Sequence, residues 1–171
     1  GQTAEQRQTD RRDRLIEAGI ELFGTRGYAN TPVKAICEEA GLTERYFYEA
    51  FEDREALLDA IYEILIGACA KATIVAIEGS PDELEASMRA GLTAFAHELT
   101  RDPRRARIQE IEVVGVSPDL ELKRREAIHA FAGIVADRTR ELGGRDRVGA
   151  LRLDVIALGL VGSVNEQLID F

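Results

Sequence analysis

The stretch from Thr31 to Phe51, TPVKAICEEAGLTERYFYEAF, places the strongest constraint on what this chain can fold into. Its first half has apolar residues at helical spacing, which predicts a short helix with one buried face: Val33, Ile36, Cys37 and Ala40. Pro32 suits the first position of that helix, with Thr31 before it as a capping hydroxyl.

The second half of the stretch predicts a turn and another helix. Gly41 is expected to end the first helix, because glycine adopts a left-handed backbone at low cost. Thr43 is expected to cap a second helix running from Glu44 towards Tyr48. Helix, glycine turn and helix form the helix-turn-helix pattern, whose second helix enters a DNA major groove.

Helical periodicity and capping residues predict an all-α chain of eight helices with no strand. Residues 1–9 are polar and expected to be mobile. Four helices are expected to begin at N-capping residues, which are Asp53, Ser80, Asp102 and Ser117. Ser80 is expected to form a capping box with Glu83, with Pro81 in the first helical position, and a proline also follows Asp102 and Ser117. Besides the two motif helices, we expect helices at about 10–26, 54–78, from Pro81, 102–115, 117–142 and 146–169. We therefore expect a three-helix DNA-binding domain over residues 1–53 and a helical bundle over 54–171.

The formal net charge of the chain is -9, which opposes non-specific binding to nucleic acid. Residues 1–55 hold eight Arg or Lys and twelve Asp or Glu, so the motif needs a locally basic face. Arg7, Arg11, Arg12 and Arg14, with Lys34, Arg45 and Arg54, could supply it. No apolar run approaches the roughly 18 residues that span a bilayer, and the polar N-terminus shows no signal peptide. Cys37 and Cys69 fit no metal spacing and are expected to be reduced. These features favour a cytoplasmic protein.

The motif region resembles the TetR family of transcriptional regulators. Positions over roughly residues 10–58 carry the resemblance: Ala18, Leu22-Phe23, Gly27-Tyr28, Thr31-Pro32-Val33, Ile36, Ala40-Gly41-Leu42-Thr43, Phe47-Tyr48, Phe51 and Arg54-Glu55-Ala56-Leu57. The resemblance implies a homodimer that binds a pseudo-palindromic DNA operator. It also implies a helical ligand-binding domain in which a small-molecule effector releases the DNA, as expected of a repressor.

The same resemblance implies which residues contact DNA. Phosphate-contacting positions are matched by Thr31, Lys34, Thr43, Tyr48 and Arg54, the last standing where a lysine is usual. Positions facing base edges are matched by Arg45 and Tyr46. Glu44, Glu49 and Ala50 depart from the commoner small, basic or aromatic residues of the family, so the operator sequence cannot be derived.

The larger domain is expected to hold the effector between the helix from Arg54 and the three helices after it. Its candidate ligand-binding residues are Phe95, His97, Arg107, Gln109 and His129, with Asn165 and Glu166 approaching from a partner subunit. The last helix, from Leu151 to Leu168, is apolar with small residues among its members, which favours a role in dimerisation. Whether a further helix follows Phe171 is left open.

Two other functional classes were weighed. An enzyme is not expected, because two histidines support no Ser/His/Asp or Cys/His set. Glu126 and His129 have a spacing used in di-iron bundles, but the other histidine, His97, lacks a glutamate three residues before it. Neither a metal nor a cofactor is therefore expected. A helical adaptor that binds a protein partner without DNA remains the alternative.

Overall fold

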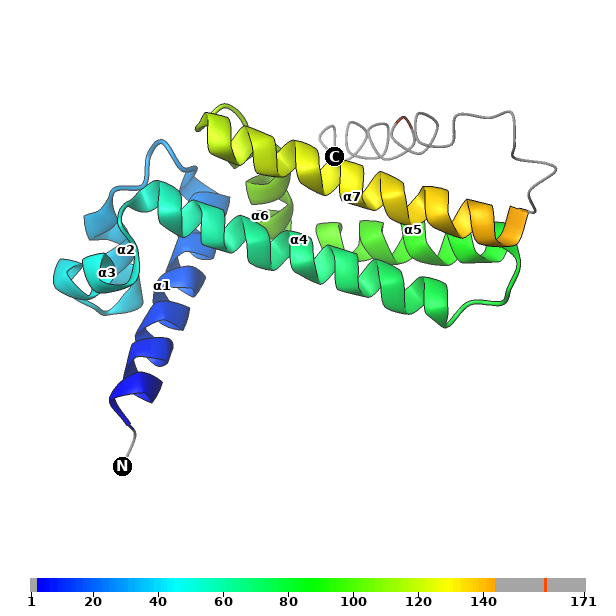
Figure 1. Ribbon diagram of the computed structural model, residues 1–171. Coiled ribbons are helices and arrows are strands. Elements are labelled where there is room, and N and C mark those ends of the chain that lie inside the picture. Colours follow the sequence, from blue (N-terminus) through cyan, green and yellow to red (C-terminus); the bar gives the residue numbers. More distant parts are fainter. Residues whose placement is uncertain (1–2, 144–158, 160–171) are drawn as a thin grey trace. The chain divides into compact units, whose positions relative to one another are not determined.

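The computed structural model describes residues 3–143 and Gly159. Every regular element in this part of the chain is a helix, which confirms the all-α class (Figure 1). The helices are α1 (Ala4–Arg26), α2 (Val33–Ala40), α3 (Glu44–Ala50), α4 (Arg54–Glu78), α5 (Leu84–Thr100), α6 (Pro103–Arg107), the π-helical turn η1 (Ile108–Glu112) and α7 (Pro118–Gly143).

Helix α1 begins earlier than the sequence suggested. Thr3 and Gln6 form a capping box, in which the Gln6 amide N–H donates to the Thr3 hydroxyl and the Thr3 amide donates to the Gln6 side chain. This box satisfies donors that a helix start leaves unpaired. The expectation of a mobile segment up to residue 9 is therefore wrong. Gly27 ends the helix with φ 89°, as expected.

The helix-turn-helix pattern is confirmed, with changes at both N-caps. Gly41 has φ 62° and its N–H donates to the carbonyls of Cys37 and Glu38, which closes α2. The N-cap of α2 is Pro32, so neither the Thr31 cap nor Pro32 at the first helical position is correct. Thr43 occupies the N-cap position of α3, but its hydroxyl makes no capping hydrogen bond.

The later helices keep two of three expected caps. Asp102 accepts from the N–H of Arg104 at 3.0 Å, and the Ser117 hydroxyl accepts from the N–H of Leu120 at 3.3 Å. The expected Ser80–Glu83 capping box is wrong, because α5 follows Glu83 and the Ser80 hydroxyl donates to the Ile77 carbonyl instead. The helix expected at 102–115 consists of α6 and η1, and the one expected at 146–169 lies outside the described residues.

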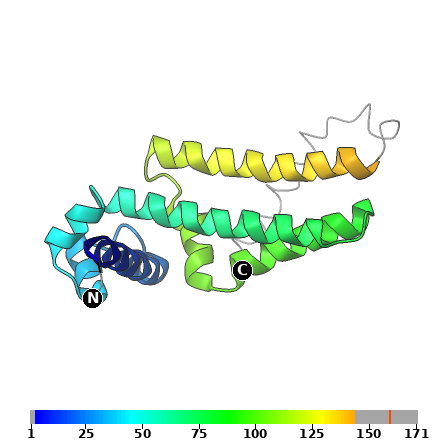
Figure 2. The same cartoon turned by 60° about the horizontal axis from the view of Figure 1, so that its bottom comes forward.

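Packing divides the chain into two compact units. The first unit contains residues up to Leu65 together with Asp102–Val116, and the second contains Ile66–Arg101 together with the described residues from Ser117 onward. This division differs from a boundary between residues 53 and 54, because α4 contributes to both units and because α6 packs on α1. In the second unit, α5 and α7 run beside the later part of α4 (Figure 1, Figure 2).

Helix α4 is long and apolar enough to cross a membrane by length and composition alone, with a mean hydropathy of 1.8 over its best window. The expectation that no uninterrupted apolar run reaches about 18 residues still holds, because Glu63 and Lys71 interrupt this helix. A core helix passes the same test, and α4 packs in both units. Its buried residues are Leu57, Leu58, Ile61, Tyr62 and Leu65 in the first unit, and Cys69, Thr73 and Ile77 in the second.

Two glycines set how closely helices approach α1 in the first unit. A Cβ on Gly19 would lie 2.6 Å from Ile61 Cδ1. A Cβ on Gly24 would overlap the Cβ of Arg104 and lie 2.7 Å from its Cα, so α6 touches α1 through backbone. Side chains seldom allow such an approach, and Gly24 is therefore needed for α6 to pack here.

We expect Gly24→Ala to destabilise the protein by about 1–3 kcal/mol, because the added methyl overlaps Arg104 backbone that has no flexible end to yield. Chemical denaturation monitored by circular dichroism measures this change. The control is Gly67→Ala on α4, where an added Cβ meets nothing within 4 Å. The control should be neutral or stabilising by up to about 1 kcal/mol. Equal behaviour of the two variants would contradict the packing argument.

Candidate DNA-binding surface and apolar pocket

Helix α3 separates a buried face from an exposed one. Phe47 is fully buried and stacks with Phe51 at a centroid distance of 5.9 Å. Tyr48 is 56% exposed, and its ring meets Phe47 edge-on at 5.4 Å. Arg45 is exposed over 83% of its side chain. Arg45 and Tyr48 therefore lie on the outer face of this helix, and Phe47 anchors it to the core.

Two cations of this surface are paired with carboxylates one helical turn away. Arg45 Nε lies 3.0 Å from Glu49 Oε1, and Lys34 Nζ lies 3.9 Å from Glu38 Oε1. Exposed pairs of this kind contribute about 0.2–1 kcal/mol, so a phosphate or base edge can displace the carboxylate. The acidic residues in the motif therefore compete with DNA for the cations.

Three arginines of α1 support the motif from behind. Arg14 Nη2 donates to the carbonyls of Ala40 and Gly41, the last of which lies at 3.3 Å. Arg12 Nη1 donates to the Ala50 carbonyl at 3.1 Å and its guanidinium lies 4.3 Å from the Phe51 ring centroid. Arg11 lies 4.3 Å above the ring of Tyr46. Cations at helix C-termini are stabilised by unpaired carbonyls and by the helix dipole. Tyr46 is consequently half-buried, less open to DNA than Tyr48.

Two residues expected to touch phosphate are engaged inside the first unit. Thr31 is fully buried, and its hydroxyl donates to the Gly27 carbonyl at 2.8 Å. Its side chain is therefore not presented to a phosphate. Arg54 Nη1 donates to the carbonyls of Thr31 at 2.7 Å and Tyr28 at 3.1 Å, and the guanidinium lies 4.9 Å from the Tyr28 ring. Burial raises the pKa of Tyr28, an effect that Arg54 partly offsets.

Sequence reasoning missed a set of contacts that fasten α6 and η1 to α1. Arg104 bonds to both Glu21 and Asp102, and its side-chain hydrogen bond to Asp102 lowers the pKa of that carboxyl. Arg107 donates to the Thr25 carbonyl at 3.0 Å and to Glu112 at 2.8 Å. No sequence pattern could reveal the Arg104–Glu21 and Arg107–Thr25 pairs, because their members lie more than 80 positions apart.

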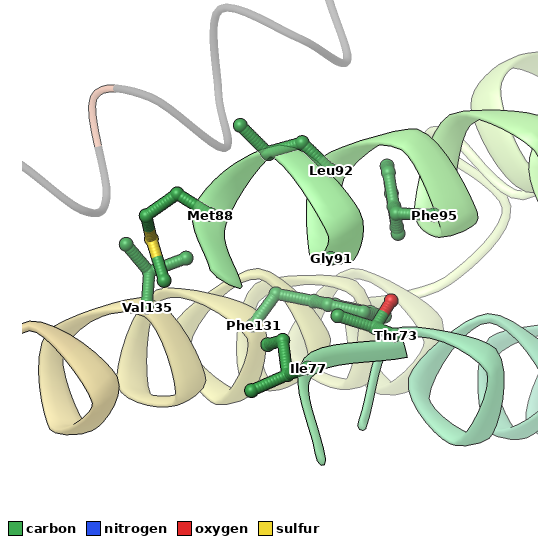
Figure 3. A pocket seen from close by; sticks show the side chains of 8 residues that line it. All are labelled: Thr73, Ile77, Met88, Gly91, Leu92, Phe95, Phe131 and Val135. Atoms are coloured by element: carbon green, nitrogen blue, oxygen red, sulfur yellow. The ribbon is translucent and has the colours of Figure 1, made fainter. Parts of the chain in front are cut away.

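The second unit contains an apolar pocket between α4, α5 and α7 (Figure 3). Its lining residues are Thr73, Ile77, Met88, Gly91, Leu92, Phe95, Phe131 and Val135. Met88 and Val135 lie together at one end, and Phe95 and Thr73 lie at the other. The cavity holds about 20 Å³ in this conformation, roughly one water molecule. A larger ligand would have to move the lining side chains apart.

The residues expected to bind an effector do not converge on this pocket as a set. Phe95 lines it, stacking on Phe131 at a centroid distance of 4.7 Å. His97 and His129 are exposed on α5 and α7. Arg107 and Gln109 belong to the first unit, where Gln109 is buried and donates to the Arg105 carbonyl. Asn165 and Glu166 lie outside the described residues.

The pocket also contains residues that the sequence showed only as an apolar stripe. Met88, Leu92 and Phe95 recur at helical spacing on α5, which indicates burial without distinguishing a pocket from a filled core. Gly91 allows a close approach of α5 to Ile77, since a Cβ there would lie only 2.9 Å from the Ile77 side chain. Among the described residues, no group of three or more His, Cys, Asp or Glu side chains is arranged to hold a metal ion.

Helices α1, α2 and α3, with Phe47 buried and Arg45 and Tyr48 outside, define a helix-turn-helix DNA-binding domain. Residues 15–61 match the family described as bacterial regulatory proteins, tetR family. The N-terminal domain of this chain therefore belongs to the TetR family. A relative from Bacillus subtilis (strain 168), the HTH-type transcriptional regulator YerO, is 36% identical over 58 residues. That match covers 34% of this chain and only 20% of the relative.

Solved structures extend the likeness of fold to most of the chain. The fatty acid degradation regulator FadR from Bacillus halodurans superposes with a TM-score of 0.82 at 17% identity, covering 94% of this chain and 83% of that one. FadR from Bacillus subtilis in complex with stearoyl-CoA gives a TM-score of 0.79 at 18% identity, with coverages of 91% and 83%. These identities establish a shared fold and nothing about shared ligands.

We expect Arg54→Lys to destabilise the protein by about 1–3 kcal/mol, because an ammonium lacks the planar fork that serves the Tyr28 and Thr31 carbonyls together. Thermal unfolding at fixed ionic strength measures the change. Arg45→Lys, on the exposed face of α3, is the matched control and should leave the free energy of unfolding within about 0.5 kcal/mol of wild type. A stable Arg54→Lys protein would show that the two carbonyl contacts contribute little.

Proposed function

We propose that this chain is a ligand-responsive transcriptional regulator that binds a pseudo-palindromic operator as a homodimer. The observation that carries the proposal is the exposed face of α3, held by Phe47 within a domain of the TetR family. Release of DNA by an effector makes it a repressor that works in the cytoplasm. Two recognition helices would then read half-sites about 34–36 Å apart.

The proposed contacts with the operator are of two kinds: contacts with phosphates, which position the protein on the DNA, and contacts with base edges, which recognise the sequence. Tyr48 donates its hydroxyl to a phosphate, because it is exposed and has its ring braced by Phe47. Arg45 leaves Glu49 and reaches a base edge, where guanine accepts two hydrogen bonds from a guanidinium. Lys34 and Thr43 are exposed at the starts of the motif helices and add phosphate contacts. Arg54 acts through the fold, by fixing the connector before α2.

The proposed effector is a molecule with a long apolar chain. Its binding site is the pocket between α4, α5 and α7, whose lining is apolar apart from the Thr73 hydroxyl. That hydroxyl donates to the Cys69 carbonyl, so it offers little polarity to a ligand. The likeness of fold to a protein solved with stearoyl-CoA supports a fatty-acyl chain as the occupant. Met88, with its flexible thioether, can move aside as the chain enters.

For DNA binding, we expect Arg45→Ala to weaken binding to a selected operator more than to a scrambled duplex, since loss of a bidentate base contact costs about 1–3 kcal/mol of discrimination. Tyr48→Phe should weaken both duplexes alike, by about 0.5–1.5 kcal/mol per half-site. The operator is obtained by enriching random duplexes on the purified protein, and affinities are measured by fluorescence anisotropy at several salt concentrations.

Glu44→Gln is a control that should change affinity in the opposite direction. Removing this carboxylate from the neighbourhood of the phosphates should tighten binding to both duplexes. Equal losses for Arg45→Ala on operator and scrambled DNA would make Arg45 a phosphate contact only. Failure of the wild type to enrich any sequence would contradict the proposed function and favour the adaptor alternative.

For the pocket, we expect Gly91→Leu to abolish binding of fatty-acyl compounds while leaving operator affinity unchanged, because the new side chain and the Ile77 side chain that it displaces fill the pocket. Displacement of a fluorescent fatty acid reports ligand binding, and release of the operator by acyl compounds reports the response. Gly67→Leu, where the surroundings are open, should retain both. Undiminished ligand binding by Gly91→Leu would place the effector elsewhere.

A further inference from the structure

A cluster of polar side chains in the second unit takes no part in the proposed reading of DNA. Its centre is Arg138 on α7, whose side chain is only 16% exposed. Nε and Nη2 each lie 3.2 Å from the Ser87 hydroxyl on α5. Nη2 also donates to Asp82 at 3.0 Å, and Nη1 donates to Glu141 at 3.2 Å. A largely buried guanidinium is thus held by one hydroxyl and two carboxylates.

Two serine hydroxyls continue the cluster towards α4. Ser87 is completely buried, and its Oγ lies 2.8 Å from Ser80 Oγ. The Ser80 hydroxyl also reaches the Ile77 carbonyl at 2.7 Å, and Ser87 reaches the Pro81 carbonyl at 3.2 Å. Hydroxyl hydrogens rotate freely and each oxygen both donates and accepts, so these serines can turn towards an added acceptor.

The cluster is formed by residues that lie close in the sequence to residues lining the apolar pocket. Three pocket residues lead into it along their helices: Ile77 is followed by Ser80, Met88 is preceded by Ser87, and Val135 is followed one turn later by Arg138. In the close view, Met88 and Val135 mark one end of the pocket, opposite Phe95 and Thr73 (Figure 3). The polar cluster therefore lies about one helical turn beyond residues of the pocket lining, so a ligand with an apolar body and one polar end could occupy the pocket and reach the cluster.

We propose that Arg138, with Ser87 and Ser80, binds the anionic head group of a single-chain amphiphile whose hydrocarbon chain fills the apolar pocket. This inference rests on the proposed function, since it assigns the polar end of the same effector. The head group is a carboxylate or a phosphate, because both accept two parallel hydrogen bonds from a guanidinium.

The carboxylates that now neutralise Arg138 can give way to such a ligand. Asp82 and Glu141 are exposed over 88% and 64% of their side chains, so they can swing into water at little cost. Glu83 and Glu85 are also exposed near this turn and oppose an incoming anion. Arg138 is largely buried and needs a counter-charge. An incoming anionic head group would therefore replace Asp82 or Glu141 as the acceptor of its hydrogen bonds.

The experiment compares three probes of equal chain length: palmitate, palmitoyl-CoA and the neutral hexadecanol. Dissociation constants are measured by displacement of a fluorescent fatty acid from the full chain. The wild type should bind at least one anionic probe roughly tenfold more tightly than hexadecanol, the scale of a charge-assisted bidentate contact. Arg138→Gln should reduce that ratio to about one while hexadecanol binding stays close to wild type.

Two variants sharpen the test. Arg140→Gln removes an arginine on the same helix that is 55% exposed and paired with Asp137, so the ratio should stay as in the wild type. Asp82→Asn removes a competing carboxylate, so the ratio should rise. If Arg138→Gln fails to fold by circular dichroism, Asp82→Asn and Arg138→Lys decide the result.

Each outcome has one meaning. Dependence on Arg138 for palmitate indicates a carboxylate head, and dependence for palmitoyl-CoA alone indicates a phosphate head. An unchanged ratio in both Arg138→Gln and Asp82→Asn overturns the inference and leaves Arg138 as a tie between the α4–α5 turn and α7, with the proposed apolar effector intact. Failure of every probe to bind the wild type contradicts the proposed effector and this inference together.

Discussion

Arginine side chains that donate to main-chain carbonyl oxygens hold the first unit in shape. Arg14 serves the end of α2, Arg12 the end of α3, Arg107 the end of α1, and Arg54 the connector between α1 and α2. The last carbonyls of a helix have no partner within it, and the helix dipole favours a cation beside them. Short helices such as α2 and α3 have little stability alone and depend on such contacts from their neighbours.

This use of arginine resolves the conflict between an acidic chain and a DNA-binding motif. Several cations that a charge count assigns to a basic face are committed to the fold: Arg12, Arg14 and Arg54 keep their charge but already donate to main-chain carbonyls. Lys34 and Arg45 remain on the surface, each beside a glutamate. Binding would then depend on a few placed contacts more than on general attraction, which suits a regulator that must ignore most of the genome.

The second unit follows a different physical rule. Its core is built from aromatic and aliphatic side chains of α4, α5 and α7, with Phe95 against Phe131 near the middle. Gly91 lets α5 pack closely against Ile77 in that core, and Met88 adds a flexible side chain to it. Arg138 lies beyond the pocket lining, and in this conformation its guanidinium is satisfied by the Ser87 hydroxyl and by the carboxylates of Asp82 and Glu141.

The sequence by itself determined the helical class, the helix-turn-helix and most helix ends. These features depend on local rules: the periodicity around Ile36 and Phe47, the left-handed turn at Gly41, and the caps at Asp53 and Asp102. Local rules also gave one wrong prediction. Thr31 has a hydroxyl that could cap α2, but its side chain is buried and does not cap this helix.

Only the tertiary structure decided which polar groups are free and which are engaged. The bonds of Arg54, the backbone contact between Gly24 and Arg104, and the meeting of Arg138 with Ser87 join residues that are distant in sequence. Residue type and spacing show what a side chain can do. The partner that it meets is set by packing, because a buried polar group takes the nearest acceptor that the folded chain provides.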